Sequence, residues 1–212
     1  MAESDELNHR EKIPTLPLSY TDSFPRITKE TLLGCIDRKL DLCFDRLIIV
    51  DCRFRYEYEG GHIDGAISLA PRFGSIVDTN FFDDLIPGKS DQGRTSICLY
   101  CEFSQYRSPL VADRIRSNDR QYDIERYPAL LYPDIYILDG GYNSFFNAYP
   151  ERCVPQAYIQ MTHPVHQRVC DEELHRLRRA TKPSKVSTFG RLGRKSSDLP
   201  RVTEYWASTM EL

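Results

Sequence analysis

Three short and uninterrupted apolar segments constrain the fold of this chain more than any other feature. They are Leu47-Ile48-Ile49-Val50, Ser96-Ile97-Cys98-Leu99-Tyr100 and Ile135-Tyr136-Ile137-Leu138. Strands with apolar side chains on both faces must be covered on both faces, which is typical of parallel sheets flanked by helices. A helix capped by Thr28 precedes the first strand, and another helix is expected to begin near Ser108 and Pro109. The alternation predicts an α/β fold with an open parallel sheet and right-handed crossovers.

The length of 212 residues is enough for one domain with a full core and two tails. Residues 1–18 are polar and contain two prolines, which predicts a flexible arm. Residues 19–163 hold the strands, with a glycine-rich turn over 60–66 and a short edge strand over 67–69. Residues 164–212 form a basic C-terminal tail, in which we expect a short polar helix over 171–179 and then a disordered segment.

The net charge of -3 is unevenly distributed along the chain. The segment from Arg168 to Arg201 holds ten Lys or Arg and four Asp or Glu, so the rest of the chain carries a charge of -9. An acidic body with a basic tail favours a tail that binds a protein partner. The acidic body also gives little support for direct binding of nucleic acid.

Seven cysteines are scattered through the expected strands and helices. Only Cys98 and Cys101 have C-x-x-C spacing, and no second pair accompanies them as in a zinc site, so we expect neither a metal nor a cofactor. No apolar run has the length of a bilayer span, and the first residues lack the basic and apolar regions of a signal peptide. We therefore expect a soluble protein in a reducing compartment, where most thiols are free and buried.

One cysteine stands at the end of a predicted buried strand. The segment Cys101-Glu102-Phe103-Ser104-Gln105-Tyr106-Arg107-Ser108 places five residues between the cysteine and the arginine and leads into a helix. Ligands bind at the carboxyl ends of strands in open α/β folds, and the N–H groups of a helix N-terminus bind phosphate. Arg107 adds a planar fork for two phosphate oxygens. We interpret residues 101–107 as a phosphate-binding loop.

Such a loop favours Cys101 as a nucleophile. Its positive field is expected to lower the thiol pKa from about 8.5 toward roughly 3.5–7.5. The thiolate can attack phosphorus and form a phosphocysteine, which water then hydrolyses, and Ser108 can hydrogen-bond the departing thiolate. Because this spacing also occurs by chance, the alternative is a buried cysteine with Arg107 on a solvated helix.

Three blocks of sequence resemble the catalytic domain of the M-phase inducer phosphatases, which are dual-specificity enzymes that activate cyclin-dependent kinases. The blocks are Ile48 to Ala66, which contains Asp51-Cys52-Arg53; Cys101-Glu102-Phe103-Ser104 with Arg107 and Pro109; and Tyr127 to Tyr142. The resemblance implies a rhodanese-like fold over about residues 24–163. It also implies a cyclin-dependent kinase–cyclin complex as protein substrate and a role in entry into mitosis. We expect a monomer in the nucleus and cytoplasm that does not bind membranes.

The resemblance also implies a role for each matching residue. Cys101 is the nucleophile and Arg107 is the phosphate clamp. Cys52 takes the place of a cysteine that forms a reversible disulfide with the nucleophile and protects it from irreversible oxidation. Glu102 is a candidate general acid, although a group on the protein substrate can also serve. The phosphate-binding loop comprises Glu102, Phe103, Ser104, Gln105, Tyr106, Arg107 and Ser108. Substrate docking falls on a remote surface formed by Arg116, Arg120 and Tyr127.

Four positions depart from the usual family pattern. Tyr100, Tyr106, Ser108 and Leu110 stand where the family usually has His, Glu, Gly and Arg. The loss of a loop glutamate keeps open a catalytically silent module that binds the kinase. A sulfurtransferase and an arsenate reductase on the same fold are further alternatives, although sulfurtransferase loops are one residue shorter and arsenate reductases lack the tail. His62 in the glycine-rich turn is expected to make a structural hydrogen bond to backbone.

Overall fold

A computed structural model describes residues 11–18, 23–69, 93–122 and 130–180. The chain divides into two units, residues 1–181 and 182–212, and all the described residues belong to the first. The helices are α2 (Lys29–Ile36), α3 (Arg55–Glu59), α5 (Arg107–Tyr122), α6 (Gly141–Ala148) and α7 (Gln167–Ala180), with short 3-10 helices η3 (Pro150–Arg152) and η4 (Pro164–His166). The strands are β1 (Arg26–Ile27), β2 (Arg46–Asp51), β3 (His62–Ile63), β4 (Ile67–Ser68), β5 (Thr95–Tyr100), β6 (Asp134–Leu138) and β7 (Cys153–Val154).

Five strands form one sheet in the order β1-β6-β5-β2-β4, and all neighbours run parallel. The three apolar segments of the sequence are β2, β5 and β6, which lie side by side in the middle of the sheet. A separate antiparallel pair joins β3 to β7. The predicted α/β fold with an open parallel sheet is confirmed.

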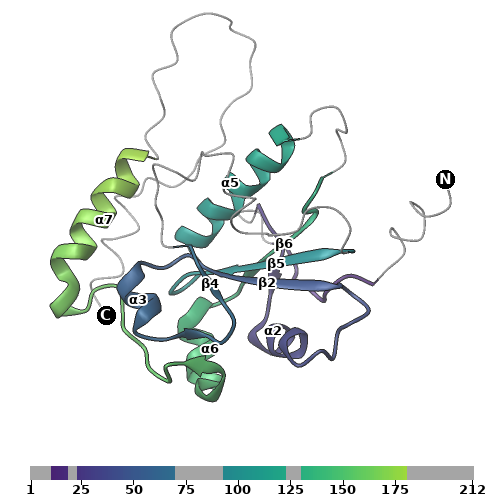
Figure 1. Ribbon diagram of the computed structural model, residues 1–212, viewed down its shortest axis with the longest axis horizontal. Coiled ribbons are helices and arrows are strands. Elements are labelled where there is room, and N and C mark those ends of the chain that lie inside the picture. Colours follow the sequence, from purple (N-terminus) through teal and green to yellow (C-terminus); the bar gives the residue numbers. More distant parts are fainter. Residues whose placement is uncertain (1–10, 19–22, 70–92, 123–129, 181–212) are drawn as a thin grey trace, which may run out of the picture. The chain divides into compact units, whose positions relative to one another are not determined.

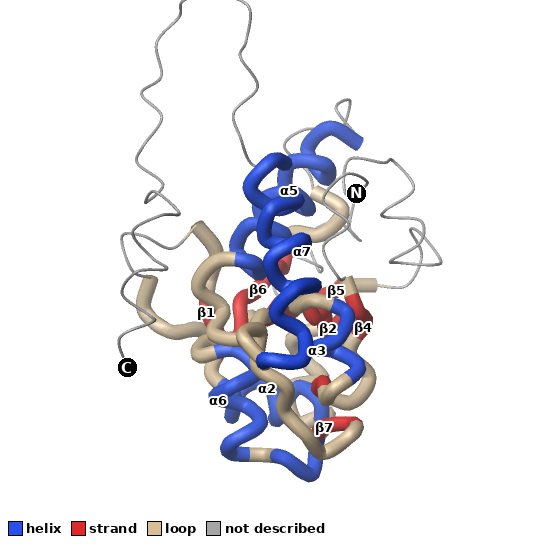
Figure 2. Tube along the Cα trace, turned by 90° about the vertical axis from the view of Figure 1, so that its left-hand side faces the viewer, coloured by secondary structure: helices blue, strands red, loops and turns tan. Residues whose placement is uncertain are grey.

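Helices cover both faces of the sheet, as the apolar strands require (Figures 1 and 2). On one face, Val111 and Ile115 of α5 pack in a core cluster with β2 and β5 side chains. On the other face, Leu32 of α2 and Phe145 of α6 belong to a second core cluster. The alternation of side chains along β5 divides the strand between these faces: Cys98 and Tyr100 belong to the second cluster, whereas Ile97, Leu99 and the following Cys101 belong to the first.

Local signals account for the helix ends that were predicted. Thr28 caps α2, because its Oγ1 accepts a hydrogen bond from the N–H of Thr31 at 3.1 Å. Helix α5 begins at Arg107, just before the predicted Ser108 and Pro109. Helix α7 begins earlier than the predicted 171–179 segment, and its buried side chains Cys170 and Leu177 lie seven residues apart on one side. The basic segment after residue 180 lies outside the described residues.

The described part of the N-terminal arm packs against the domain. Ile13 is only 2% exposed and belongs to the core cluster of α2 and α6. The N–H of Leu16 donates to the carbonyl of Arg26 at 2.8 Å, which ties the arm to strand β1. Residues 11–18 therefore differ from the flexible arm that their polar composition predicts, because one apolar side chain anchors them. Among the described helices, none combines the length and apolarity that a membrane crossing needs.

Candidate active site

The loop from Cys101 to Arg107 connects the end of β5 to the start of α5, at the carboxyl edge of the sheet. Cys101 is 4% exposed. Ser104 adopts a left-handed backbone conformation with φ of 55°, and its Oγ accepts a hydrogen bond from the N–H of Cys101 at 3.4 Å. Ser108, in the first turn of α5, donates its hydroxyl toward the Cys101 sulfur at 3.6 Å. The loop is thus curled over the cysteine, as the sequence predicts.

Helix α6 holds the outer side of this loop. The N–H of Tyr142 donates to the carbonyl of Cys101 at 2.9 Å, and the N–H of Asn143 donates to the carbonyl of Glu102 at 3.0 Å. In a planar trans peptide the carbonyl and the following N–H point in opposite directions. The N–H groups of Glu102 and Phe103 therefore point away from α6. This orientation leaves two backbone donors for an anion.

The Arg107 guanidinium is held by a buried carboxylate on α3. Its Nη2 donates to Oε1 of Glu57 at 3.0 Å, and its Nη1 donates to Oε2 of the same carboxylate. The guanidinium carbon lies 4.8 Å from the centre of the Phe54 ring. Although burial opposes its charge, the attraction of Glu57 raises the pKa of Arg107, and the nearby Cys101 adds to this. The guanidinium to which the resemblance gives the role of phosphate clamp is therefore charged and held at two points by Glu57.

Cys52 lies beside Cys101 on the same face of the sheet. Asp51 pairs with Tyr100 in the β2–β5 ladder, so Cys52 and Cys101 are the next residues of adjacent strands. Both belong to the core cluster under α5. Neighbouring strands are about 4.8 Å apart, which is within the Cα separation of about 4.4–6.8 Å that disulfides need. Burial and then the Cys101 charge raise the pKa of the Cys52 thiol well above its ordinary value.

Glu102 is a loop carboxyl that is tied to the segment after β7. Its Oε1 accepts from the hydroxyl of Tyr158 at 2.7 Å, and its Oε2 accepts from the N–H of Met161 at 3.4 Å. Burial and then repulsion by Glu57 raise the pKa of Glu102. The raised pKa suits a proton donor, but both oxygens already accept hydrogen bonds and the residue is only 6% exposed. To act as the expected general acid, Glu102 has to be released by Tyr158 and Met161.

Of the residues that depart from the usual family pattern, Tyr100 lies in the core and Tyr106 lies in the loop. Tyr100 is fully buried on the face of α6, where its hydroxyl accepts from the N–H of Ile63 at 3.2 Å. This substitution therefore alters the core and not the loop over Cys101. Tyr106 is half-buried in the loop itself. His62 makes the expected structural contact, because its Nδ1 lies 2.9 Å from the carbonyl of Tyr58.

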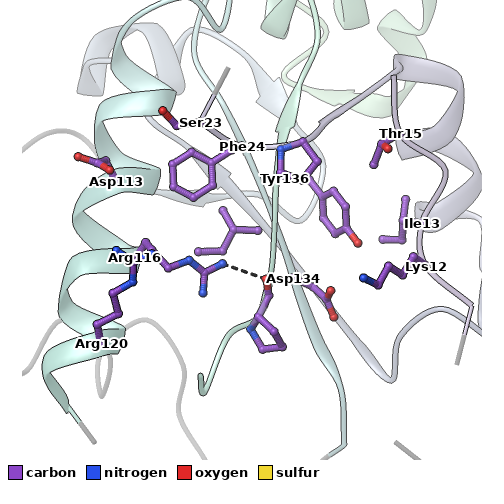
Figure 3. Close-up of a pocket in the computed structure, with 13 residues that line it drawn as sticks. Lys12, Ile13, Thr15, Ser23, Phe24, Asp113, Arg116, Arg120, Asp134 and Tyr136 are labelled. Atoms are coloured by element: carbon purple, nitrogen blue, oxygen red, sulfur yellow. Dashed lines mark hydrogen bonds between the residues drawn. The ribbon is translucent and has the colours of Figure 1, made fainter. Parts of the chain in front are cut away.

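Two of the three expected docking residues, Arg116 and Arg120, line a cavity of about 440 Å³ beside α5 (Figure 3). Arg116 donates to the carbonyls of Tyr132 at 2.8 Å and Pro133 at 2.9 Å, so its guanidinium supports the chain before β6. Arg120 is exposed one turn further along the helix. The structure brings these two arginines together on one side of α5, whereas Tyr127 lies outside the described residues.

Sequence reasoning missed Glu57, Phe54 and Tyr158. A local signal exists for the first of these. The carboxylate of Glu57 accepts from the N–H of Phe54 at 2.8 Å, which is half of a capping box at the start of α3. No local pattern indicates that the same carboxylate binds Arg107, which is 50 residues away in the chain.

Within the described ranges, no group of three or more His, Cys, Asp or Glu side chains could hold a metal ion. The site is therefore described by its loop amides, its thiol, its guanidinium and its two buried carboxyls. Together these groups can bind a dianion and attack it with sulfur.

Comparison with known proteins finds one matching domain family and several similar phosphatases. A model of the rhodanese-like domain matches residues 36–148. An M-phase inducer phosphatase of Emericella nidulans is 39% identical over 184 residues, which are 87% of this chain and 32% of that protein. The corresponding Schizosaccharomyces pombe protein is 40% identical over 171 residues, which are 80% of this chain and 28% of that protein. M-phase inducer phosphatase 3 of Homo sapiens is 37% identical over 156 residues, which are 73% of this chain and 32% of that protein.

The resemblance to M-phase inducer phosphatases that the sequence blocks indicate is thereby confirmed. The chain spans about a third of the length of the relatives it matches.

Proposed function

This chain belongs to the rhodanese-like domain family, and we propose that it is a dual-specificity protein phosphatase that works through a phosphocysteine at Cys101. The observation that carries this proposal is the curled loop between β5 and α5. It places the cysteine beside the Ser108 hydroxyl and near a rigid Arg107, with two loop amides turned away from α6. Five residues between the cysteine and the arginine give a loop of the size expected for tetrahedral phosphate rather than for a single sulfur atom.

The reaction proceeds in two displacements. The Cys101 thiolate attacks phosphorus, so that a P–S bond forms and the P–O bond to the substrate breaks, and the leaving oxygen takes a proton. The loop amides and Arg107 balance the charge of the phosphoryl oxygens. Water then attacks the phosphocysteine, the P–S bond breaks and inorganic phosphate leaves. Ser108 stabilises the departing thiolate through its hydroxyl.

The proton for the leaving oxygen comes from Glu102 or from the protein substrate. The raised pKa of Glu102 supports the first source, because a protonated carboxyl is a donor at higher pH than usual. The two hydrogen bonds that Glu102 already accepts favour the second. Tyr106 offers no carboxyl at the remaining loop position.

The protein substrate that we propose is a cyclin-dependent kinase in complex with its cyclin, dephosphorylated on tyrosine and threonine. The names of the similar proteins support this, since they are inducers of M phase. The kinase docks along Arg116, Arg120 and Tyr127, and the basic tail adds contacts with the partner. In this proposal the enzyme is a monomer that acts in the nucleus and cytoplasm and promotes entry into mitosis.

Cys52 serves as the redox partner of the nucleophile. A peroxide oxidises the Cys101 thiolate to a sulfenic acid, and the Cys52 thiol displaces its oxygen as water to form a disulfide. A cellular dithiol reduces this disulfide and restores the thiolate. The adjacent positions of Cys52 and Cys101 on neighbouring strands support this role.

The decisive experiment compares the wild-type chain with Cys101→Ser on an aryl phosphate and on a doubly phosphorylated cyclin-dependent kinase. We expect the wild type to turn over both and Cys101→Ser to turn over neither while it still binds phosphate. A silent kinase-binding module would bind the kinase without turnover in either form. Retained activity in Cys101→Ser would overturn the mechanism. Transfer of sulfur from thiosulfate, or oxidation of thiols that depends on arsenate, would favour the other enzymes of this fold.

A further inference from the structure

We propose that Glu57 is a positioning residue of the phosphate site, which fixes the Arg107 guanidinium so that its remaining N–H groups can bind the phosphoryl oxygens. This inference rests on the proposed phosphatase function. Glu57 lies on α3, outside the loop itself. Its role is therefore exerted through Arg107.

Glu57 and Arg107 form a bidentate salt bridge, in which the two carboxylate oxygens face the two terminal nitrogens; we call this pairing the fork. Oε1 accepts from Nη2 at 3.0 Å and Oε2 accepts from Nη1, so both terminal nitrogens are engaged. A guanidinium has five N–H donors, and this pairing uses two of them. The Nε–H and one N–H on each terminal nitrogen lie outside this fork, and Nη2 also lies 3.9 Å from Oε2 of Glu102. Glu57 thus selects which edge of Arg107 is available.

Glu57 is itself held in place. It is 0% exposed, and its Oε2 also accepts from the N–H of Phe54 at 2.8 Å. The ring of Phe54 lies against the guanidinium, with its centre 4.8 Å from the central carbon. One short segment of chain, from Phe54 to Glu57, therefore restrains Arg107 both by charge and by packing.

Two effects of the Glu57 charge oppose each other. Its negative charge weakens the attraction of Arg107 for a phosphate dianion, whereas its fork removes the rotational freedom of the arginine before the dianion binds. Orientation is the stronger effect here, because an error of about 1 Å in a catalytic group can cost on the order of a hundredfold in rate. Removal of the charge alone should therefore weaken phosphate binding and not strengthen it.

The substitution Glu57→Gln tests this balance. A glutamine keeps the shape of the side chain but places an NH₂ donor opposite a donor of Arg107 or of Phe54, so the fork is lost. Glu59→Gln is the matched control, because Glu59 is on the same helix and pairs with Arg55 at the surface. Binding of inorganic phosphate is measured by calorimetry in the Cys101→Ser background, and kcat and KM on an aryl phosphate are measured with the cysteine intact.

We expect Glu57→Gln to weaken phosphate binding and to lower kcat/KM by about tenfold or more, and Glu59→Gln to change neither. In an Arg107→Lys background, Glu57→Gln should no longer weaken phosphate binding, since the fork is already absent and only the repulsion by the Glu57 charge is removed. Glu57→Asp keeps the charge but shortens the reach, and it should give an intermediate loss. Melting temperatures identify any variant that does not fold. If Glu57→Gln does not fold, the phosphate binding of Glu57→Asp is compared with that of the wild type instead.

Unchanged or tighter phosphate binding in a folded Glu57→Gln chain would refute the positioning role. An equal loss in the Arg107→Lys background would also refute it, because Glu57 would then act on the fold and not on the arginine. Both outcomes concern phosphate affinity, which is measured without turnover. They are therefore distinct from a failure of the phosphatase assignment, which is judged by the turnover of the wild type and of Cys101→Ser.

Discussion

At the residue scale, the loop from Cys101 to Arg107 contains a carboxyl that is costly to ionise. Burial and the Glu57 charge raise the pKa of Glu102 above its ordinary value of 4.5. The folded chain therefore binds the Glu102 proton more tightly than the unfolded chain does. The stability that this group contributes is fully present below the unfolded pKa and is lost as the pH rises through the folded pKa.

We predict that Glu102→Gln flattens part of the pH dependence of stability. The wild type should lose stability relative to the variant as the pH rises from about 4 towards neutrality, because only the wild type must ionise a buried carboxyl in that range. Denaturant unfolding of both proteins at several pH values measures this difference, in which all other titrations cancel. Parallel stability curves over the whole range would contradict the raised pKa.

Cys52 leads to a second prediction at this scale. Since Cys52 is adjacent to Cys101 across the β2–β5 ladder, oxidation of the wild type with peroxide should be largely reversed by dithiothreitol. Cys52→Ser should lose this recovery and accumulate sulfinic acid on Cys101, which mass spectrometry detects. Cys98→Ser is the control. Cys98 is buried like Cys52, but it lies on β5 and belongs to the cluster on the other face of the sheet. Equal recovery in all three proteins would argue against the redox pair.

At the scale of elements, the loop that begins at Cys101 is shaped by helix α6, which begins about forty residues later. Helix α6 begins with Gly141, which has φ of 60° and lies so close to the loop that a Cβ atom would be 2.4 Å from the Cys101 carbonyl oxygen. The next two residues donate their N–H groups to the loop carbonyls. A glycine at this point is therefore required both by backbone conformation and by space.

We predict that Gly141→Ala destabilises the protein by about 2–3 kcal/mol and displaces the loop, with a large loss of turnover. The matched control is Gly34→Ala in α2, where a Cβ would meet nothing closer than 3.7 Å. That substitution should stabilise the chain by roughly 0.5–1 kcal/mol and leave turnover unchanged. Thermal unfolding and aryl phosphate turnover test both variants. A Gly141→Ala chain with normal stability and rate would show that the contact of α6 with the loop is dispensable.

Short elements account for most of what the sequence patterns did not predict. Helix α3 has five residues and β1, β3, β4 and β7 have two each, of which only the edge strand at 67–69 was expected. Elements of this length have no room for a hydrophobic period. Their positions are set by contacts with the rest of the fold, and α3 is the one that supplies Glu57.

At the scale of the whole domain, the loop from Cys101 to Arg107 follows the end of β5, whereas the cavity lined by Arg116 and Arg120 includes the start of β6. Cys101 follows the last residue of β5, whereas Pro133 and Asp134 of the cavity stand at the start of β6. Asp134 is paired with Ser96, which lies five residues before Cys101 on β5. About 16 Å along the strand direction therefore separates Asp134 from Cys101. Substitutions in one site should therefore leave the other intact.

We predict that Arg120→Glu lowers kcat/KM for the phosphorylated kinase by about tenfold, because it reverses the charge on the surface along which the kinase is proposed to dock. Turnover of an aryl phosphate should not change. Arg114→Glu is the control, since Arg114 is exposed on the same helix but does not line the cavity. If both variants lower kcat/KM for the kinase equally, the net charge of the chain causes the loss and the proposed docking surface does not. A loss on the aryl phosphate would contradict the separation of the two sites.

The sequence by itself determined the central strands and the place of the loop from Cys101 to Arg107. These depend on local information: a run of apolar side chains, a cysteine directly after it, and the start of a helix at the arginine. The adjacency of Cys52 and Cys101, expected only from the resemblance, agrees with the two buried strands lying next to each other.

The tertiary structure alone decided how the buried polar groups are paired. Glu57 binds Arg107 across 50 residues of chain, and Glu102 is bound by Tyr158 across 56. Arg116, which is charged and helical and therefore expected at the surface, donates instead to two backbone carbonyls before β6. A buried polar group must find a partner, but which partner it finds depends on the order of strands and the path of the connections. No local period in the sequence carries that information.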